Sequence, residues 1–355
     1  MHKAAWLALV MACVWAGAYG GPGRIGGLMP VAAVVHATGA SRIEQLDGLA
    51  EWYRDGALIV DGQRVRVYEK TKYKGRFGRG LATIPLGSEV TVRGARQADG
   101  TFIATEVDAR PNGSGYFDQA VLSATNTAEA EWLQKGQVGE AAADAPPSRV
   151  LKSGPMVERV SRMVGRLTPP YRSVDSFRAY AVENKDWNAM AMANGAIWVY
   201  SGLAGDMDDD ELALVVGHEL AHVTHEHTRR EFRRGMAVQL IALGVALSAE
   251  ASDQKRTKQV VQLAALFSAM VYKNGYSRDL EDQADRVGLR YAYQGGYDIS
   301  KAPRLWRRFE EKYGSQNKVV NYLFGGHSAV KDRVRNLERE LALNYPDVRP
   351  SGPRP

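Results

Sequence analysis

Alternating apolar and polar residues mark the first third of the chain. The stretches GALIVDGQRVRVYEKTKYKG and GSEVTVRGARQADGTFIATEVDARP follow the period of two that is typical of half-buried strands. Asp61-Gly62 and Asp99-Gly100 are dipeptides of the kind that closes a β-hairpin. The pattern over residues 41–110 therefore predicts a small all-β domain of about five strands.

This domain resembles the small OB-type barrels that are fused to exported bacterial proteins. Barrels of that class often bind nucleic acid or sugar. A basic run interleaved with aromatic residues could form such a surface; it comprises Lys70, Lys72, Lys74, Arg76 and Arg79 with Tyr73 and Phe77. The alternative is a solvated edge hairpin, because lysines also keep exposed strand edges from pairing with other chains.

The pattern changes twice after this domain. Residues 111–149 are rich in Ala, Gly, Glu and Pro with little apolar periodicity, which predicts a linker. From residue 150 to 345 the apolar positions indicate a mainly helical domain with a few strands, followed by a tail at 346–355. The helices are predicted in VERVSRMVGRL, MDDDELALVVGHELAHVTHEH, DLEDQADRVGLRYAYQ, KAPRLWRRFEEKYG and KDRVRNLERELALN, and the strands in FRAYAVEN and AMAMANGAIWVYSGL. The fold class is thus α+β.

Two apolar runs occupy residues 235–249 and 260–272. Each is well short of the roughly 20 residues that a membrane span needs, so we expect a buried helical hairpin.

Composition adds little to this picture. A chain of 355 residues with 45% hydrophobic and 24% charged residues is globular, and its formal charge of +6 is spread among interleaved acidic residues. The charge favours anionic surfaces weakly and is not a nucleic-acid footprint.

The first 40 residues read as a leader followed by a Gly/Ala-rich stretch. A short basic start, an apolar run and small residues are typical of a secretory signal, so we expect export. Cys13, the one cysteine, ends LVMAC, which resembles a lipoprotein lipobox. The alternative is an ordinary signal peptide cut after Ala18 or Ala37. Neither reading leaves a partner for an internal disulfide.

The stretch GHELAHVTHEH holds four of the seven histidines. His218 and His222 stand four residues apart, hence on one helix face, where two imidazoles can take adjacent corners of one zinc ion. In the pattern H-E-x-x-H, Glu219 is the general base. His225 and His227 are expected to be bystanders, dipole-stabilised groups at the surface end of the helix.

A third ligand must come from elsewhere. The metzincin extension is excluded because His225 and Thr228 replace its Gly and last His. A glutamate-ligand arrangement needs an acid on a second helix, and YSRDLEDQADRVG supplies Glu281. Asp285, one turn on, can accept the free ring N–H of a ligating histidine.

Four segments in order carry a family resemblance: NAMAMANGAIWVYSGL, DELALVVGHELAHVTHEH, GYSRDLEDQADRVGLRYAYQGGYD and HSAVKDRVRNLE. They resemble the gluzincin family that includes the HtpX heat-shock protease, the CAAX prenyl endopeptidase and the BepA-type proteases. The resemblance implies one zinc ion per chain on His218, His222 and Glu281, with Glu219 as the catalytic base.

The same resemblance implies two further features of the site. MAMANG, with Ala191, Met192, Ala193 and Asn194, would be an edge strand onto which substrate backbone adds. His327 matches a downstream loop histidine that approaches the zinc, helps hold the oxyanion and gates the site. Ser328 replaces the family's proline after it, and the alternative is a surface histidine.

These features together predict an exported zinc metalloendopeptidase, periplasmic or lipid-anchored, that hydrolyses unfolded or misassembled envelope proteins. The alternative is a chaperone-like assembly factor with a latent or structural zinc site, whose all-β domain recruits a partner. A nucleic-acid partner is not expected, because export separates the protein from nucleic acid.

Overall fold

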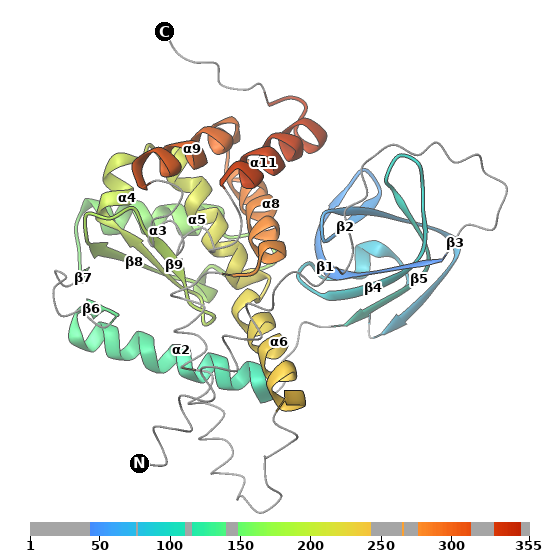
Figure 1. The fold of residues 1–355 in the computed structure, drawn as a ribbon, viewed down its shortest axis with the longest axis horizontal. Coiled ribbons are helices and arrows are strands. Elements are labelled where there is room, and N and C mark those ends of the chain that lie inside the picture. Colours follow the sequence, from blue (N-terminus) through green and yellow to red (C-terminus); the bar gives the residue numbers. More distant parts are fainter. Residues whose placement is uncertain are drawn as a thin grey trace, which may run out of the picture.

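The computed structural model describes residues 43–75, 77–110, 116–139, 148–242, 265, 276–313 and 330–348. A five-stranded barrel lies beside a mainly helical domain that holds a second five-stranded sheet (Figure 1). This is the predicted α+β arrangement of an OB-like barrel followed by a helical domain with a small sheet.

The barrel is built from β1 (Glu44–Arg54), β2 (Ala57–Val60), β3 (Gln63–Gly75), β4 (Glu89–Arg96) and β5 (Phe102–Arg110). The strand order is β1-β2-β3-β5-β4, with β4 returning to β1, and only the β3–β5 pair is parallel. The hairpins predicted at Asp61-Gly62 and Asp99-Gly100 join β2 to β3 and β4 to β5. A third hairpin turn, Asp55-Gly56, was missed; both of its residues have positive φ, as a type I′ turn requires.

The lysines of the barrel's basic run lie on the part of β3 that extends beyond its pairing with β2. β3 pairs with β2 only at Gln63–Val65, and its neighbour at Lys72 and Lys74 is the parallel strand β5, so these lysines lie on an open edge, as expected, although not in a hairpin. Lys70, Lys72 and Lys74 are exposed, and Lys74 pairs with Glu106 at 2.8 Å. The barrel closes through β2 at the start of β3, and the lysines lie beyond that pairing, where they can keep the open edge from pairing with other chains.

The second sheet has the order β6-β7-β8-β10-β9. Its strands are β6 (Gln137–Val138), β7 (Ser148–Leu151), β8 (Arg178–Glu183), β9 (Ala189–Ala191) and β10 (Ala196–Tyr200). Every residue of β10 is buried because both faces of the sheet are covered. One face packs on α2 through Trp198 and Tyr180, and the other on α3 and α5 through Ile197 and Val199.

The segment predicted to be a linker contains α2 (Tyr116–Lys135), which runs along the lower side of the sheet in Figure 1. The sequence does not predict this helix, because few apolar residues mark a face along it. Tertiary contacts supply the stability instead. Trp132 lies edge-on to Trp198 with ring centroids 5.3 Å apart, and Glu129 binds Arg178 through two hydrogen bonds of 2.7 and 2.8 Å.

The helices of the second domain follow the sequence periodicity closely. They are α3 (Pro155–Leu167), α4 (Ser201–Asp206), α5 (Asp209–Thr224), α6 (His227–Ala242), α8 (Arg278–Gln294), α9 (Ala302–Tyr313) and α11 (Val330–Asn344), with one-turn 3-10 helices at Leu81–Thr83, Val174–Ser176 and Ile299–Lys301. The predicted stop of α8 is confirmed, since Gly296 has φ +77. The short α4, the 3-10 helices, the end of α5 at Thr224 and the start of α6 at His227 were not anticipated.

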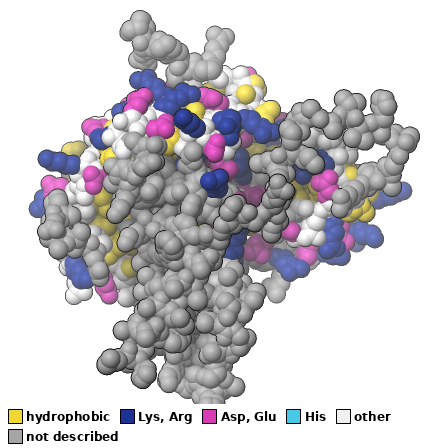
Figure 2. All heavy atoms as spheres, in the orientation of Figure 1, with side chains coloured by type: hydrophobic (Ala, Val, Ile, Leu, Met, Phe, Trp, Pro, Cys, Tyr) yellow, Lys and Arg dark blue, Asp and Glu magenta, His cyan; other side chains and the backbone are white. Residues whose placement is uncertain are grey.

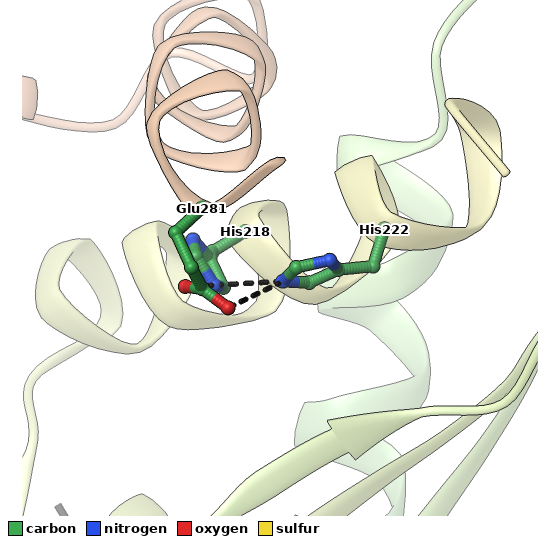
Figure 3. Close-up of side chains that lie close together, drawn as sticks. All are labelled: His218, His222 and Glu281. Carbon is green, nitrogen blue, oxygen red and sulfur yellow. Dashed lines mark hydrogen bonds and ion pairs between the residues drawn. The ribbon is translucent and has the colours of Figure 1, made fainter. Parts of the chain in front are cut away.

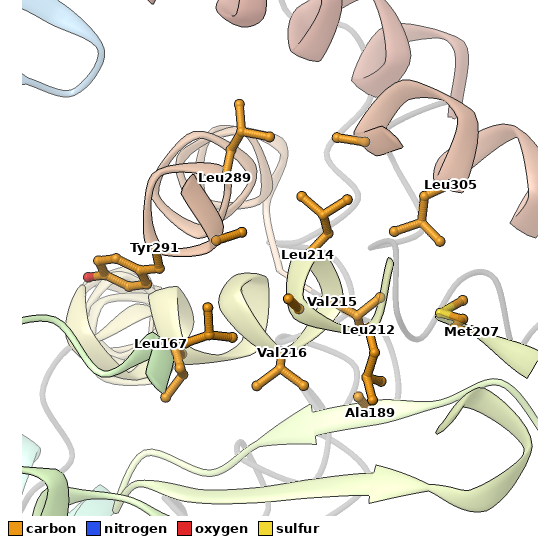
Figure 4. Close-up of a cluster of buried hydrophobic side chains, with 14 of the residues drawn as sticks. Leu167, Ala189, Met207, Leu212, Leu214, Val215, Val216, Leu289, Tyr291 and Leu305 are labelled. Atoms are coloured by element: carbon orange, nitrogen blue, oxygen red, sulfur yellow. The ribbon is translucent and has the colours of Figure 1, made fainter. Parts of the chain in front are cut away.

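The close approach of α5 and α8 forms the centre of the core (Figure 4). Gly217 and Gly288 make it possible: a Cβ on Gly288 would lie 2.7 Å from the Cα of His218, and one on Gly217 would lie 2.7 Å from the carbonyl oxygen of Gly288. Leu212, Val216 and Leu289 pack around this contact. Helices α5 and α8, which are far apart in sequence, are thereby held together beside His218.

Several predictions fall outside the described residues: Cys13 and the leader, Arg76, His327, residues 243–249 of the first apolar run and all of the second except residue 265. Within the described part of the chain, no helix is both long and apolar enough to cross a membrane. Basic and acidic side chains are interspersed over the described part of the face in Figure 2, as the charge pattern predicts.

Candidate metal centre

Two imidazole rings face each other on α5. His218 and His222 are buried, with 2% and 4% of their surface exposed, and their Nε2 atoms lie 3.0 Å apart (Figure 3). The helical spacing of four residues predicts this proximity. Both rings are buried because the sheet, α3, α8 and α9 cover α5 on its four sides.

Glu281 reaches the same point from α8. Its Oε2 lies 3.4 Å from His218 Nε2, and its Oε1 lies 3.9 Å from His222 Nε2. One ligand atom from each of the three residues can be chosen so that all lie within 4.8 Å of one another. A tetrahedral zinc ion with bonds of about 2.0–2.2 Å separates its ligand atoms by about 3.3 Å, so the donors fit one ion.

The protonation states of His218 and His222 also fit a cation between the two rings. Burial would lower the pKa of His218, but hydrogen bonds to Asp285 and Glu281 outweigh it and raise the pKa to about 9. Burial, with the positive charge of His218 second, holds the pKa of His222 well below its usual value. Two facing imidazole nitrogens repel unless a positive charge lies between them. A shared proton can supply that charge, and so can a metal ion.

Asp285 contacts His218 at Nδ1, the ring nitrogen that does not face His222 and Glu281. Its Oδ1 lies 3.0 Å from Nδ1 of His218, the geometry expected of a carboxylate that orients a ligating imidazole. Burial opposes ionisation of Asp285, but the Arg333 guanidinium and His218 hold its pKa at about 2. The carboxylate is therefore charged at neutral pH.

Arg333 of α11 is a member of this site that the sequence analysis missed. It is fully buried and binds Asp285 through Nε at 2.8 Å and Nη2 at 2.6 Å, while Nη1 lies 3.3 Å from Oε2 of Glu281. Its guanidinium stacks over Trp306 at 4.2 Å. A charged residue at a core position of the KDRVRNLERELALN helix was the available signal, because buried charges require partners.

Glu219 lies next to His218 in the chain and is buried as well, with 6% of its surface exposed. Burial raises the pKa of its carboxyl to about 8, and the positive charge of His218 partly offsets this. The backbone N–H of Ala191 also acts on this carboxyl and lowers its pKa, although burial outweighs it. A carboxyl with a raised pKa at this point is suited to accept and return a proton.

Ala191 ends β9, which lies at one edge of the described sheet, with β6 at the other. The predicted edge segment was too long: Met192, Ala193 and Asn194 form the turn to β10 instead. The N–H of Met192 donates to the carbonyl of Ala196, and the Asn194 side chain donates to Glu129. The strand that lies against Glu219 is thus Ala189–Ala191.

His225 and His227 are not surface groups, as they were expected to be; both are fully buried. Helix α5 ends at Thr224, Glu226 has φ +57, and α6 begins at His227. Nδ1 of His227 lies 2.8 Å from Nδ1 of His222, whereas His225 bonds to Thr224 at 2.9 Å. His227 therefore contacts the candidate ligand His222 at Nδ1, the ring nitrogen that does not face His218.

Both domains match models of known protein families. The model of peptidase family M48 matches residues 152–341, and the model of a domain of unknown function, DUF5666, matches residues 42–108. The first match covers more than half of the chain and includes all of the residues gathered around His218, His222 and Glu281.

Individual relatives are similar over the helical domain. Metalloprotease YcaL of Escherichia coli K12 is 38% identical over 157 residues, 44% of this chain and 59% of that protein. Metalloprotease LoiP of the same organism is 33% identical over 161 residues, 45% of this chain and 61% of that protein. A putative beta-barrel assembly-enhancing protease of Vibrio cholerae is 28% identical over 178 residues, 49% of this chain and 36% of that protein. The chain thus spans between 36% and 61% of the length of these relatives.

Proposed function

The chain belongs to peptidase family M48, and from that premise we propose that it is a zinc-dependent endopeptidase acting on unfolded or misassembled envelope proteins. The observation that carries the proposal is the buried set of His218, His222 and Glu281, with Glu219 beside it and an edge strand against Glu219.

The three donors would hold one zinc ion per chain. When bound, zinc supplies Lewis-acid chemistry, which polarises a scissile carbonyl and acidifies a water molecule. Asp285 keeps the proton of His218 on Nδ1, so that Nε2 offers its lone pair.

Glu219 is the proposed general base. Its carboxylate takes a proton from the attacking water and delivers it to the nitrogen of the leaving amine. A pKa raised by burial favours both halves of this transfer, since a carboxyl with a pKa near the working pH can bind and release the proton readily.

Substrate is proposed to add to β9 as an extra strand. Main-chain hydrogen bonds would then supply most of the affinity, which makes recognition tolerant of side-chain sequence. An extended segment of an unfolded protein can meet that requirement, whereas a folded one cannot. The leader-like N-terminus supports an envelope location, and the similarity to metalloproteases and to a putative beta-barrel assembly-enhancing protease supports polypeptide partners.

His327 is proposed to approach the same site and to assist there, on the basis of the family resemblance alone; the structure does not describe it. Lipidation of Cys13 likewise stays a prediction.

Digestion of casein by the purified full chain tests the proposal. We expect cleavage that stops with a zinc chelator and returns when zinc is added, together with one zinc per chain by metal analysis. Zinc-bound protein that cleaves nothing would favour the chaperone-like alternative instead. Protein that binds no zinc would refute both.

A further inference from the structure

The barrel reaches the candidate metal centre through a buried side chain of α8. Gln283 lies two residues after Glu281 and is fully buried. Its Nε2 lies 2.8 Å from Oε1 of Glu51 and 2.9 Å from Oδ1 of Asp61, and both of these carboxylates belong to the barrel. The helical domain and the barrel thus share a hydrogen-bonded group directly behind the site.

The local structure of the barrel aims these two carboxylates outward. Glu51 lies where the pairing of β1 with β2 shifts register between Ala50 and Trp52, and such a bulge redirects a side chain. Asp61 occupies the β2–β3 turn with φ +50. Trp52 packs against the core of the helical domain and anchors the barrel in this position.

The orientation of the Gln283 amide follows from its neighbours. Two carboxylates can only accept hydrogen bonds, so the NH2 group must face Glu51 and Asp61. Oε1 faces the other way, where Arg230 Nη1 donates to it at 2.7 Å and His227 Nε2 lies 3.1 Å away. All four hydrogen-bonding positions of the amide are filled.

The orientation of the amide sets the tautomer of His227, because Oε1 can only accept. Nε2 of His227 must therefore carry the ring proton, and Nδ1 of the neutral ring has a free lone pair. That Nδ1 lies 2.8 Å from Nδ1 of His222. His222 must then carry its own proton on Nδ1, which leaves the lone pair on Nε2, the atom that faces His218 and Glu281.

We propose that the barrel is a positioning element of the metal site: Glu51 and Asp61, acting through Gln283 and His227, hold His222 in the tautomer that binds metal. The inference rests on the proposed function of His222 as a ligand. In this arrangement the relay replaces the single carboxylate that Asp285 provides for His218, and it makes metal affinity depend on docking of the barrel.

Zinc affinity of the full chain, measured by competition with a chromophoric chelator, tests the relay. We expect the double variant E51A/D61A to bind zinc about 10–100 times more weakly, the loss that removal of an outer partner of a metal ligand causes. His227→Leu should lose a similar amount. The variant that combines both changes should lose no more than the larger single effect, because all three residues act on one path.

Two controls separate the relay from general damage at the interface. Glu89→Ala removes another contact between the domains, the pair with Arg233 at 3.3 Å, and should leave zinc affinity within about two-fold. E51Q/D61N keeps oxygen acceptors for Gln283 but removes both charges, and should retain most of the affinity. Loss of affinity in E51Q/D61N equal to that in E51A/D61A would refute the hydrogen-bond relay, as would additive losses in the combined variant.

The metal-free protein gives a readout that needs neither zinc nor activity. Long-range 1H–15N spectra should show His222 protonated on Nδ1 and His227 on Nε2, and E51A/D61A should convert both to tautomer mixtures. Mixed tautomers in the wild type would overturn the inference even if some variant folds poorly. His222→Ala reports on the proposed site: if it abolishes zinc binding while E51A/D61A binds normally, the inference fails and the proposed function stands. Wild-type protein that binds no zinc would refute both the inference and the proposed function.

Discussion

Oδ1 of Asp285 lies 3.0 Å from Nδ1 of His218, and the same carboxylate is clamped by Arg333. Asp285 therefore connects a helix that carries two candidate ligands with a helix from the far end of the chain. We predict that Asp285→Asn weakens zinc binding about 10–100-fold, because the imidazole loses its charged acceptor. Chelator competition measures this. Asp282→Asn is the matched control, since Asp282 on the same helix binds only the exposed Asn336 among the described residues and should leave the affinity unchanged.

Removal of the proposed base should separate chemistry from metal binding. We predict that Glu219→Gln lowers peptide hydrolysis by roughly 10²–10⁴-fold while zinc content stays at the wild-type level. Steady-state hydrolysis and metal analysis of the same preparation give both values. Glu211→Gln, which alters a buried carboxylate of α5 that binds Arg308, should retain hydrolysis. Unchanged hydrolysis in Glu219→Gln would refute the proposed mechanism.

The contact between α5 and α8 should tolerate no added methyl group. In Gly288→Ala the new Cβ would lie 2.5 Å from the backbone nitrogen of His218, so the helices must separate. We predict a loss of about 1–3 kcal/mol in the free energy of unfolding, with weaker zinc binding because the ligands move apart. Denaturant titration of the metal-free protein measures the first effect.

Gly165→Ala is the comparison for that variant. Gly165 lies inside α3 and has nothing within 4 Å of the position that a Cβ would take. The substitution should be neutral or should stabilise the protein by up to about 1 kcal/mol, since alanine favours the helix. Equal destabilisation in both variants would contradict the packing argument.

Glu226 should make stability depend on pH. Burial raises the pKa of its carboxyl from 4.5 to about 7, although Arg229 opposes the shift. The unfolded chain therefore releases this proton before the folded one, so its contribution destabilises the fold as pH rises from about 4.5 to about 7.

A neutral side chain at this position removes that penalty. We predict that Glu226→Gln gains stability relative to the wild type between pH 5 and about 8, by roughly 3 kcal/mol at most, in thermal or denaturant unfolding. A stability difference that does not change across this range would mean that the carboxyl of Glu226 titrates normally in the folded protein.

The sequence by itself determined most of the elements and half of the site. Period-two and period-3.6 patterns place five strands before a helical domain, and the spacing within α5 brings His218 and His222 together. The acidic pair Glu281 and Asp285 could be named because both stand on one face of one predicted helix. Within an element, spacing in sequence is distance in space, which is why these predictions succeeded.

Only the tertiary structure decided the rest, because contacts between distant segments follow from packing rather than from local spacing. Helix α2 in the supposed linker depends on Trp132 meeting Trp198. His227 is buried against His222 and Gln283 at the start of α6, and Arg333 joins the site across 48 residues from Asp285. Gln283 meets Glu51 across 232 residues, so the link between the barrel and a candidate metal ligand exists only in the folded chain.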